Sequence, residues 1–231
     1  MNDDITRSIA VAAQQMGRAS NVEEVLDAIA SSAAETLPAF EHIGVSTVEK
    51  GGEVRTRAAT SDLVLELDRI QYGLAEGPCV DSLEGEDVIV VPEIRHDQRW
   101  PRYVPEAVRR GLRSQLAVRL HLADRGTTGG LNLYSTSTDA ISDDDVTSAA
   151  LFAVHASLAL GRAAESETLT AAVATRQVIG QAIGILMERY KIDDEAAHAF
   201  LWRASSHSNV KVRDIAQRLV EETRRPGARS D

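Results

Sequence analysis

The chain has 231 residues, 43% of them hydrophobic, and a formal net charge of −10. This length can bury a sizeable core in one large domain or two small ones, so we expect a globular protein. Its single cysteine excludes an internal disulfide, and no C-x-x-C or H-E-x-x-H pattern offers a metal site. No uninterrupted apolar run approaches about 18 residues, and residues 1–7 are acidic where a signal peptide is basic. We therefore expect a cytoplasmic protein without a membrane span.

The first predicted elements are a helix and a β-hairpin. Asn21 and Glu24 have the spacing of an N-cap and a capping box, and apolar residues follow at helical intervals. Residues 42–48 and 53–59 predict two strands. The segment Lys50-Gly51-Gly52 between them predicts the turn, because glycine can adopt positive φ.

The middle of the chain predicts two short helices and three strands. The helices are expected at about residues 62–72 and 102–110, and Gly111 suits the left-handed position after the second one. The strands are expected at residues 88–91, 115–122 and 130–136. The last two alternate apolar and polar residues on either side of the turn 125–129, which predicts a second hairpin. We expect an antiparallel sheet that helices cover on one face.

The last part of the chain predicts three helices. Ser142 with Asp145 can cap a long helix that reaches Tyr190 without a proline. Asp193 and Asn209 are expected to cap the two helices that follow. The long helix carries a broken heptad that would form a coiled-coil dimer seam, weakened by its polar member. Its positions are Leu151, Leu158, Glu165, Ala172, Ile179 and Leu186.

Charge is unevenly distributed along the chain. Residues 1–169 hold 15 Lys+Arg and 27 Asp+Glu, whereas residues 170–231 hold 10 and 8. The net charge of the whole chain argues against nucleic acid, because phosphate contacts need cations. The last part nevertheless allows a locally positive surface. From Leu201 onward the chain has 4 acidic residues and 7 basic ones. The basic residues are Arg203, Lys211, Arg213, Arg218, Arg224, Arg225 and Arg229.

Four segments of the first part resemble the actinobacterial branch of the GAF domain family, over residues 5–163. They are Tyr72-Gly73-Leu74-Ala75-Glu76-Gly77-Pro78-Cys79, Trp100-Pro101, Gly111-Leu112-Arg113-Ser114 and Gly130-Leu131-Asn132-Leu133-Tyr134-Ser135. The resemblance implies a pocketed α+β sensor. Its antiparallel sheet would be flanked by helices, and its ligand would be an unknown small molecule or a protein signal.

Three segments of the tail resemble an ANTAR domain, over residues 168–225. They are Ile179-Gly180-Gln181-Ala182-Ile183-Gly184-Ile185-Leu186-Met187-Glu188-Arg189-Tyr190, with Asp194-Glu195-Ala196, and Val212-Arg213-Asp214-Ile215-Ala216. The resemblance implies an all-α three-helix bundle that binds RNA stem-loops and prevents formation of a transcription terminator. The family pattern A-x-G-x-L-M falls on Ala182, Gly184, Leu186 and Met187. Ile183 stands where relatives often carry a basic residue, so one phosphate contact of the family is not expected here.

The sequence therefore predicts two domains, a sensor at residues 1–163 and an RNA-binding domain at residues 164–231, joined by the long helix. Cations, amide donors and an exposed glycine are the groups that contact RNA phosphates and loop bases. The candidates for RNA binding are Arg176, Gln181, Gly184, Arg189, Lys191, Arg203, Lys211 and Arg213.

Gly184 and the aromatic and apolar residues of the tail also have a structural interpretation. Gly184 allows either close helix packing, which we favour, or close approach of RNA. Tyr190 and Trp202 could stack on an unpaired base, but an aromatic at a helix boundary more often lies in the core. The residues expected in the bundle core are Leu186, Met187, Phe200, Leu201, Ile215 and Leu219.

No residue of the first part predicts catalysis, a cofactor or a metal. Cys79 and Trp100 are candidates for lining the sensor pocket, and Cys79 is expected either at the pocket rim or, more often, as a buried inert thiol. The sulfoxide reductases of GAF type use several cysteines, and this chain has one. The dipeptide His96-Asp97 occurs in metal phosphohydrolases, but no second His/Asp pair accompanies it here, so we do not expect a metal site. The three acids at residues 143–145 are expected to stabilise a helix N-terminus rather than to bind a metal.

The leading hypothesis is a homodimeric, signal-responsive RNA-binding antiterminator without enzymatic activity or membrane contact. Two alternatives stay open. The last two helices could form a helix-turn-helix that binds DNA, or the chain could be a sensor adaptor that binds another protein. Binding to stem-loop RNA and to duplex DNA separates the three.

Overall fold

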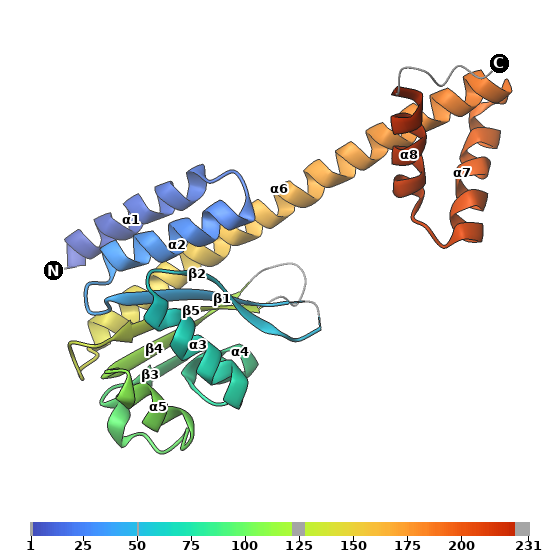
Figure 1. The fold of residues 1–231 in the computed structure, drawn as a ribbon. Coiled ribbons are helices and arrows are strands. Elements are labelled where there is room, and N and C mark those ends of the chain that lie inside the picture. Colours follow the sequence, from blue (N-terminus) through green and yellow to red (C-terminus); the bar gives the residue numbers. More distant parts are fainter. Residues whose placement is uncertain (1, 50, 122–127, 225–231) are drawn as a thin grey trace. The chain divides into compact units, whose positions relative to one another are not determined.

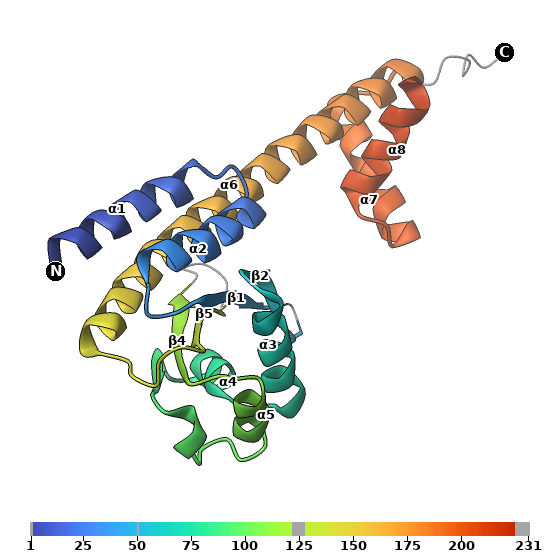
Figure 2. The ribbon, with the colours of Figure 1, turned by 60° about the vertical axis from the view of Figure 1, so that its left-hand side comes forward.

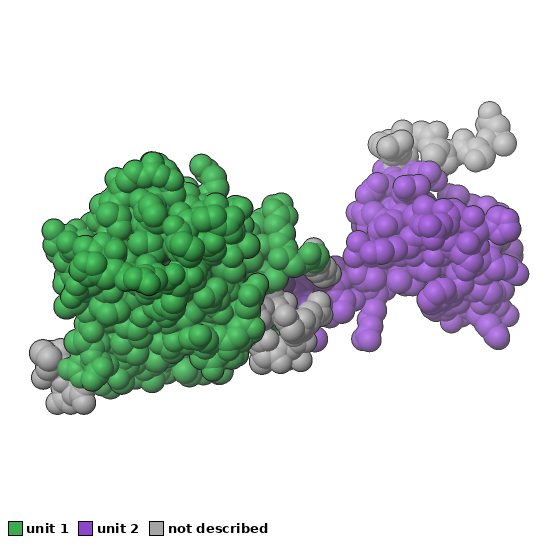
Figure 3. Space-filling model, turned by 90° about the horizontal axis from the view of Figure 1, so that it is seen from below, with its two compact units in different colours: residues 1–165 green, residues 166–231 purple. Residues whose placement is uncertain are grey.

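A computed structural model describes residues 2–49, 51–121 and 128–224 of the chain. It contains two compact units, Met1–Glu165 and Ser166–Asp231. Figure 3 shows the first unit in green and the second in purple. We call them unit 1 and unit 2. The helix α6 (Asp143–Tyr190) contributes residues to both.

Unit 1 contains a five-stranded antiparallel sheet with the order β2-β1-β5-β4-β3. The strands are β1 (His42–Val48), β2 (Val54–Ala59), β3 (Val88–Val91), β4 (Ser114–His121) and β5 (Thr128–Ser135). Both predicted hairpins are confirmed, because β1 pairs with β2 and β4 with β5. Pairing of β1 with β5 joins them. Gly51 and Gly52 have φ of 112° and 87°, as the first turn requires. Residues 125–127 of the second turn lie outside the described residues.

Among the described residues, six α-helices belong to unit 1 wholly or in part, and two of them were not predicted. They are α1 (Asn2–Arg18), α2 (Val22–Thr36), α3 (Asp62–Leu74), α4 (Pro78–Glu84), α5 (Tyr103–Arg109) and the start of α6, with a short 3₁₀ helix at Ile94–His96. The helix that the sequence predicted after Asn21 is α2, so α1 precedes it without having been predicted. The other unpredicted helix is α4. It begins directly after Gly77, which has φ of 133°, and its first residue is a proline, which favours the first turn of a helix.

One face of the sheet packs against α1, α2 and α6, which lie together on that side in Figures 1 and 2. Strand residues of alternate positions, such as Ile43, Val45 and Leu133, meet Ile29 and Phe152 from the helices, and all five are buried. Their apolar surface is removed from water on both sides, so this layer forms the main core of the unit.

The other face is covered too, by α3, α4 and α5, so the prediction of a sheet covered on one face is wrong. Gln115 and Asn132 lie at polar positions of the two alternating strands, and both have a relative exposure of 0%. A second helical layer buries these polar positions and gives them partners. Alternation along a strand distinguishes apolar from polar positions, and it carries no information on whether another layer covers the polar face.

Side-chain caps begin α2 and α6 where the sequence predicted them. The Asn21 side chain accepts from the Glu24 backbone N–H at 2.9 Å, and the Glu24 carboxylate accepts from the Ser20 N–H at 2.7 Å. At α6 the Ser142 hydroxyl accepts from the Asp145 N–H at 3.2 Å, while the Asp145 carboxylate accepts from the Ser142 N–H at 2.9 Å. These bonds, which are reciprocal between Ser142 and Asp145, satisfy N–H groups that have no partner inside the helix.

Unit 2 contains the last part of α6, α7 (Asp194–Ser208) and α8 (Val212–Arg224). Its small core is made largely of alanine and branched residues. The buried members are Ala182, Ile183, Leu186, Ala197, Leu201, Ala216 and Val220. The predicted core positions Leu186 and Leu201 are confirmed, and three others, Met187, Ile215 and Leu219, are half-buried at its edge. Phe200 is 43% exposed, so its assignment to the core is wrong.

One predicted cap is correct and one is wrong. The Asp193 carboxylate accepts from the Ala196 N–H at 2.8 Å and caps α7 as expected. Asn209 does not begin α8; it ends α7 in the left-handed conformation with φ of 54°. Asparagine suits both positions, because its short side chain tolerates positive φ as well as capping an N-terminus.

Among the described residues, one helix, α6, is long and apolar enough to cross a membrane. Of its most apolar segment of 18 residues, 33% is buried in the protein. Length and composition do not distinguish a spanning helix from a long core helix. In unit 1, Phe152, Ala156 and Leu160 of α6 are buried in the main core.

Candidate functional site

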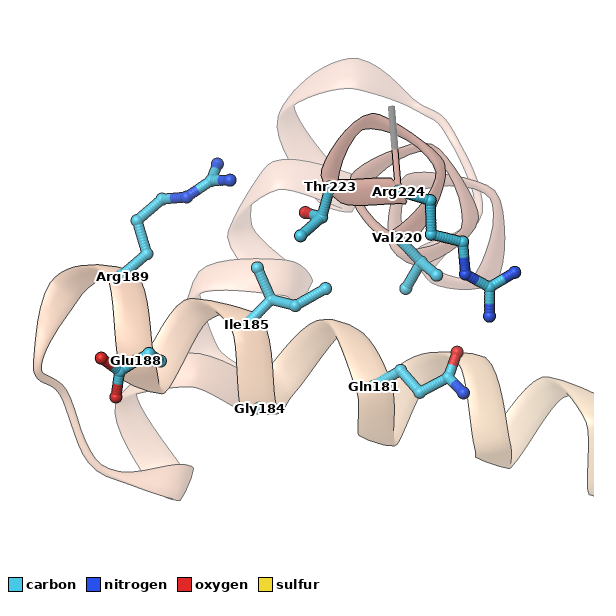
Figure 4. Close-up of a pocket in the computed structure, with 8 residues that line it drawn as sticks. All are labelled: Gln181, Gly184, Ile185, Glu188, Arg189, Val220, Thr223 and Arg224. Carbon is cyan, nitrogen blue, oxygen red and sulfur yellow. The ribbon is translucent and has the colours of Figure 1, made fainter. Parts of the chain in front are cut away.

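A groove between α6 and α8 is the first candidate site in unit 2, and Figure 4 shows its lining. It is open to solvent and has a volume of ≈ 700 Å³. The lining residues are Gln181, Gly184, Ile185, Glu188 and Arg189 of α6 and Val220, Thr223 and Arg224 of α8. Three predicted RNA-binding residues therefore lie together here, namely Gln181, Gly184 and Arg189.

The groove combines apolar groups with two guanidinium groups and with the carboxylate of Glu188, which pairs with Lys191. Ile185 and Val220 from the two helices point toward one another between Arg189 at one end and Arg224 at the other, where Gln181 also lies (Figure 4). Within the part of the chain that the structure describes, neither guanidinium forms an ion pair. Two unpaired guanidinium groups on either side of an apolar surface suit a planar or apolar group that carries phosphates.

Gly184 has open space around its Cα. A Cβ built there would meet no heavy atom within 4 Å, so packing inside the protein does not require a glycine. The packing interpretation that we favoured from the sequence is therefore not supported. Ile183, the residue that departs from the family pattern, is 6% exposed and belongs to the bundle core.

The other predicted RNA-binding residues are exposed, and they do not line the groove. Lys191 pairs with Glu188 at 2.5 Å, and Arg213 pairs with Asp214 at 3.1 Å. The remaining three, Arg176, Arg203 and Lys211, form no ion pair with any described residue. Arg224, which the groove adds, was counted among the basic residues of the tail but not selected. Its place four residues after Val220 on α8 is the signal that could have found it.

The aromatic residues of unit 2 lie on its surface. Tyr190 and Phe200 stack with ring centroids 5.9 Å apart and an interplanar angle of 28°. Tyr190 is 55% exposed and Trp202 is 62% exposed, so the interpretation of these two as core residues is wrong. Tyr190 ends α6 and Phe200 lies on α7.

The candidate pocket residues of unit 1 lie in its interior. Cys79 has a relative exposure of 0%, so it is a buried thiol rather than a residue of a pocket rim. Its Sγ accepts from the Gln71 and Gln115 side-chain amides at 3.1 Å each and lies 3.2 Å from the Tyr134 hydroxyl. Burial raises the pKa of the Cys79 thiol, so the thiolate is disfavoured.

Trp100 is 3% exposed and donates from Nε1 to the Asp81 carboxylate at 2.9 Å. The Arg99 guanidinium lies 4.3 Å from the centre of its ring. The indole is therefore fixed by a hydrogen bond from its polar atom and by a cation on its face.

Sequence reasoning missed the central acid of this interior cluster, Asp68. Its carboxylate accepts from Thr56 at 2.5 Å, from Asn132 at 3.4 Å and from the Tyr134 hydroxyl. Burial raises the pKa of Asp68 to about 6, against the opposing effect of these hydrogen bonds. Its spacing after Val64, on the buried side of α3, is the signal that could have placed it in the interior.

The interior of unit 1 offers hydrogen-bonding groups, and its cysteine is held as a buried thiol. Within the described residues no group of three His, Cys, Asp or Glu side chains could hold a metal ion. Unit 1 thus presents a closed polar interior, and unit 2 presents an open cationic groove and exposed aromatic rings.

Two family models match the chain. The GAF domain model matches residues 19–161, which is more than half of the chain, so the chain belongs to the GAF domain family. The ANTAR domain model matches residues 167–220, which include α7, most of α8 and the end of α6. A GAF domain is a sensor and an ANTAR domain is an RNA-binding module, so the chain has the architecture of a regulator.

Solved structures show the same fold as unit 1 at low sequence identity. A bacteriophytochrome from R. palustris matches with a TM-score of 0.60 and 14% identity over 79% of this chain and 43% of that chain. The GAF domain of a phosphoenolpyruvate-protein phosphotransferase from Coxiella burnetii matches with a TM-score of 0.56 and 16% identity, over 71% of this chain and 96% of that chain. A free methionine-R-sulfoxide reductase from Neisseria meningitidis matches with a TM-score of 0.52 and 12% identity, over 70% of this chain and 91% of that chain.

This chain thus spans less than half the length of the phytochrome, and these identities establish the fold alone. Among curated proteins no sequence matches the chain.

Proposed function

We propose that this protein is a signal-responsive RNA-binding transcription antiterminator of the actinobacterial type, located in the cytoplasm and without enzymatic activity. Unit 1 would bind a small molecule or a protein signal, and unit 2 would bind paired RNA stem-loops. The observation that supports the proposal best is the groove with Arg189 and Arg224, because it lies in the unit that the ANTAR domain model matches.

The charges favour RNA binding through unit 2. Phosphates need cations that are not already paired with acids, and Arg176, Arg189, Arg203, Lys211 and Arg224 are such cations within the described residues. A stem-loop also presents unstacked bases, which amide and aromatic groups can contact. Duplex DNA presents no such bases, so the surface suits RNA better than operator DNA.

We further propose a homodimer. Leu151, Val154 and Leu158 lie three and four residues apart on α6 in unit 1, and they are 43%, 55% and 60% exposed. A second copy of the chain that covers this stripe would remove it from water. Two linked copies of unit 2 would then bind paired hairpins at high effective concentration. Leu186 is buried in unit 2, so the predicted heptad does not continue to that residue as an exposed seam.

The signal would act on unit 1, and we propose that Cys79 and Trp100 would line an interior ligand pocket, because both side chains are buried. We propose no bound cofactor for this unit. Because α6 contributes residues to both units, it is the element through which a change in unit 1 would reach the RNA-binding helices.

Binding of the full chain to three nucleic acids tests the proposal. The probes are a tandem two-hairpin RNA, its single hairpin and a duplex DNA of matched length, each over a salt series. We expect the tandem RNA to bind tightest, with an affinity that falls steeply with salt. Equal or better binding of DNA would indicate a helix-turn-helix protein instead, and salt-insensitive binding of protein partners alone would indicate an adaptor.

Replacing Gly184 by alanine separates folding from RNA contact. Alanine is the better helix former and its Cβ has open space, so we expect unit 2 to gain about 1 kcal/mol of stability. The same methyl group reaches the groove, so RNA affinity should fall several-fold. Gly180→Ala is the matched control, because its Cβ also has open space but it does not line the groove. Thermal unfolding measures the stability of the two variants, and titration with RNA measures their affinity. Equal RNA affinity of the two variants would mean that the groove is not part of the binding site.

A further inference from the structure

Two aromatic rings form an exposed stack on unit 2. Tyr190 at the end of α6 and Phe200 on α7 contact each other with centroids 5.9 Å apart, and 55% and 43% of the two residues remain exposed. A buried aromatic pair stabilises a fold, whereas this pair leaves much of its surface in water. Large exposed apolar groups often mark a binding site.

The size of this stack points to a small planar partner. A stable interface with another protein contributes about 20–30 residues from each side. Two rings offer far less, but they match a single nucleobase, whose flat face stacks on an aromatic ring without requiring a particular base sequence. The shape of the site therefore favours a base over a folded protein.

The charges around the stack favour a base that carries phosphates. Arg203 follows Phe200 by three residues on α7, which places the two side chains next to each other on the helix surface. Arg189 precedes Tyr190 directly. Arg189 belongs to the lining of the groove, because adjacent residues of a helix point to different sides. Arg203 forms no ion pair with a described residue, so it is available to a phosphate next to a stacked base.

We propose that one unpaired base of the RNA loop stacks on the Tyr190–Phe200 rings, and that Arg203 contacts the neighbouring phosphate. This inference rests on the proposed function of unit 2. It assigns the recognition of an unstacked loop base to these rings, at the junction of α6 with α7, and leaves the groove between α6 and α8 for phosphate contacts.

Substitution of Phe200 by leucine in the full chain tests this assignment. The probe is the tandem stem-loop RNA with 2-aminopurine at one loop position at a time, because the fluorescence of this base reports stacking. We expect Kd to rise about 10-fold. The fluorescence change at one loop position should disappear, while the salt dependence stays unchanged because no charge is removed. Phe200→Tyr, which keeps the ring, should bind as the wild type does.

Trp202→Leu is the control, because Trp202 is 62% exposed but lies two residues from Phe200, on a different side of α7. It should leave Kd and fluorescence unchanged. The assignment is overturned if Phe200→Leu binds and stacks like the wild type, or if Trp202→Leu is the variant that loses stacking. If the wild-type chain does not bind the RNA at all, the proposed function fails, and this inference with it.

Discussion

Replacing both Arg189 and Arg224 by glutamine is expected to raise the Kd for the tandem stem-loop RNA by about 100-fold. The two guanidinium groups lie at opposite ends of the groove, and neither is paired with an acid among the described residues. A hydrogen bond to a charged group contributes about 1.5–3 kcal/mol, so the loss of two such contacts accounts for a change of this size. Glutamine keeps the length and polarity of the side chain and removes its charge.

The salt series distinguishes lost phosphate contacts from a disturbed fold. Each phosphate contact releases a counterion, so the slope of log K against log salt should become shallower by about 2 for this double variant. Arg55→Gln with Arg109→Gln is the matched control, because it removes the same charge from exposed residues of unit 1 that already pair with acids. Equal losses in the two double variants would mean that net charge, and not the groove, determines RNA binding.

Replacing Asp68 by asparagine is expected to remove a pH dependence of about 3 kcal/mol from the free energy of unfolding of unit 1. Burial raises the folded-state pKa of Asp68 from 3.8 to about 6. Between these two values the folded protein keeps a proton that the unfolded chain has lost. The stability of the wild type should therefore fall as the pH rises from about 4 to about 6, and this contribution should stay constant above the folded-state pKa.

Urea unfolding at pH 4, 5, 6 and 7 measures this effect in a Trp202→Phe background, where Trp100 is the single tryptophan and lies in unit 1. The quantity to compare is the change of the unfolding free energy with pH, because asparagine also alters the hydrogen bonds of the cluster. Asp27→Asn, at an exposed acid of α2, controls for the loss of one negative charge. Parallel pH profiles of the wild type and Asp68→Asn would contradict a buried, proton-binding carboxyl.

The sequence by itself determined those features that depend on neighbours a few residues away. The capping pairs Asn21 with Glu24 and Ser142 with Asp145 form as predicted, because a cap bonds within its own first turn. Gly51 and Gly52 specify the first hairpin turn for the same reason. The two family resemblances also follow from local motifs, and the GAF and ANTAR domain models match there.

Tertiary structure decided which polar and aromatic residues are buried. Gln115 and Asn132 alternate like solvent-facing residues, yet the layer of α3, α4 and α5 covers them and pairs them with the cluster around Asp68. Phe200 has core spacing, yet the small bundle core closes around alanines and leaves its ring exposed. Burial depends on elements that pack from far along the chain, so local periodicity does not specify it.

Some residues of the candidate site could be selected from the sequence, and others join the site only through helix packing. Gln181, Gly184 and Arg189 lie within nine consecutive residues of α6, and the motif of that segment was enough to select them. Arg224 joins them only because α8 packs alongside α6, and the Tyr190–Phe200 stack exists only because α7 folds back onto the end of α6. A groove or a ring stack needs two helices at contact distance, and that proximity is a property of the packed bundle rather than of either segment.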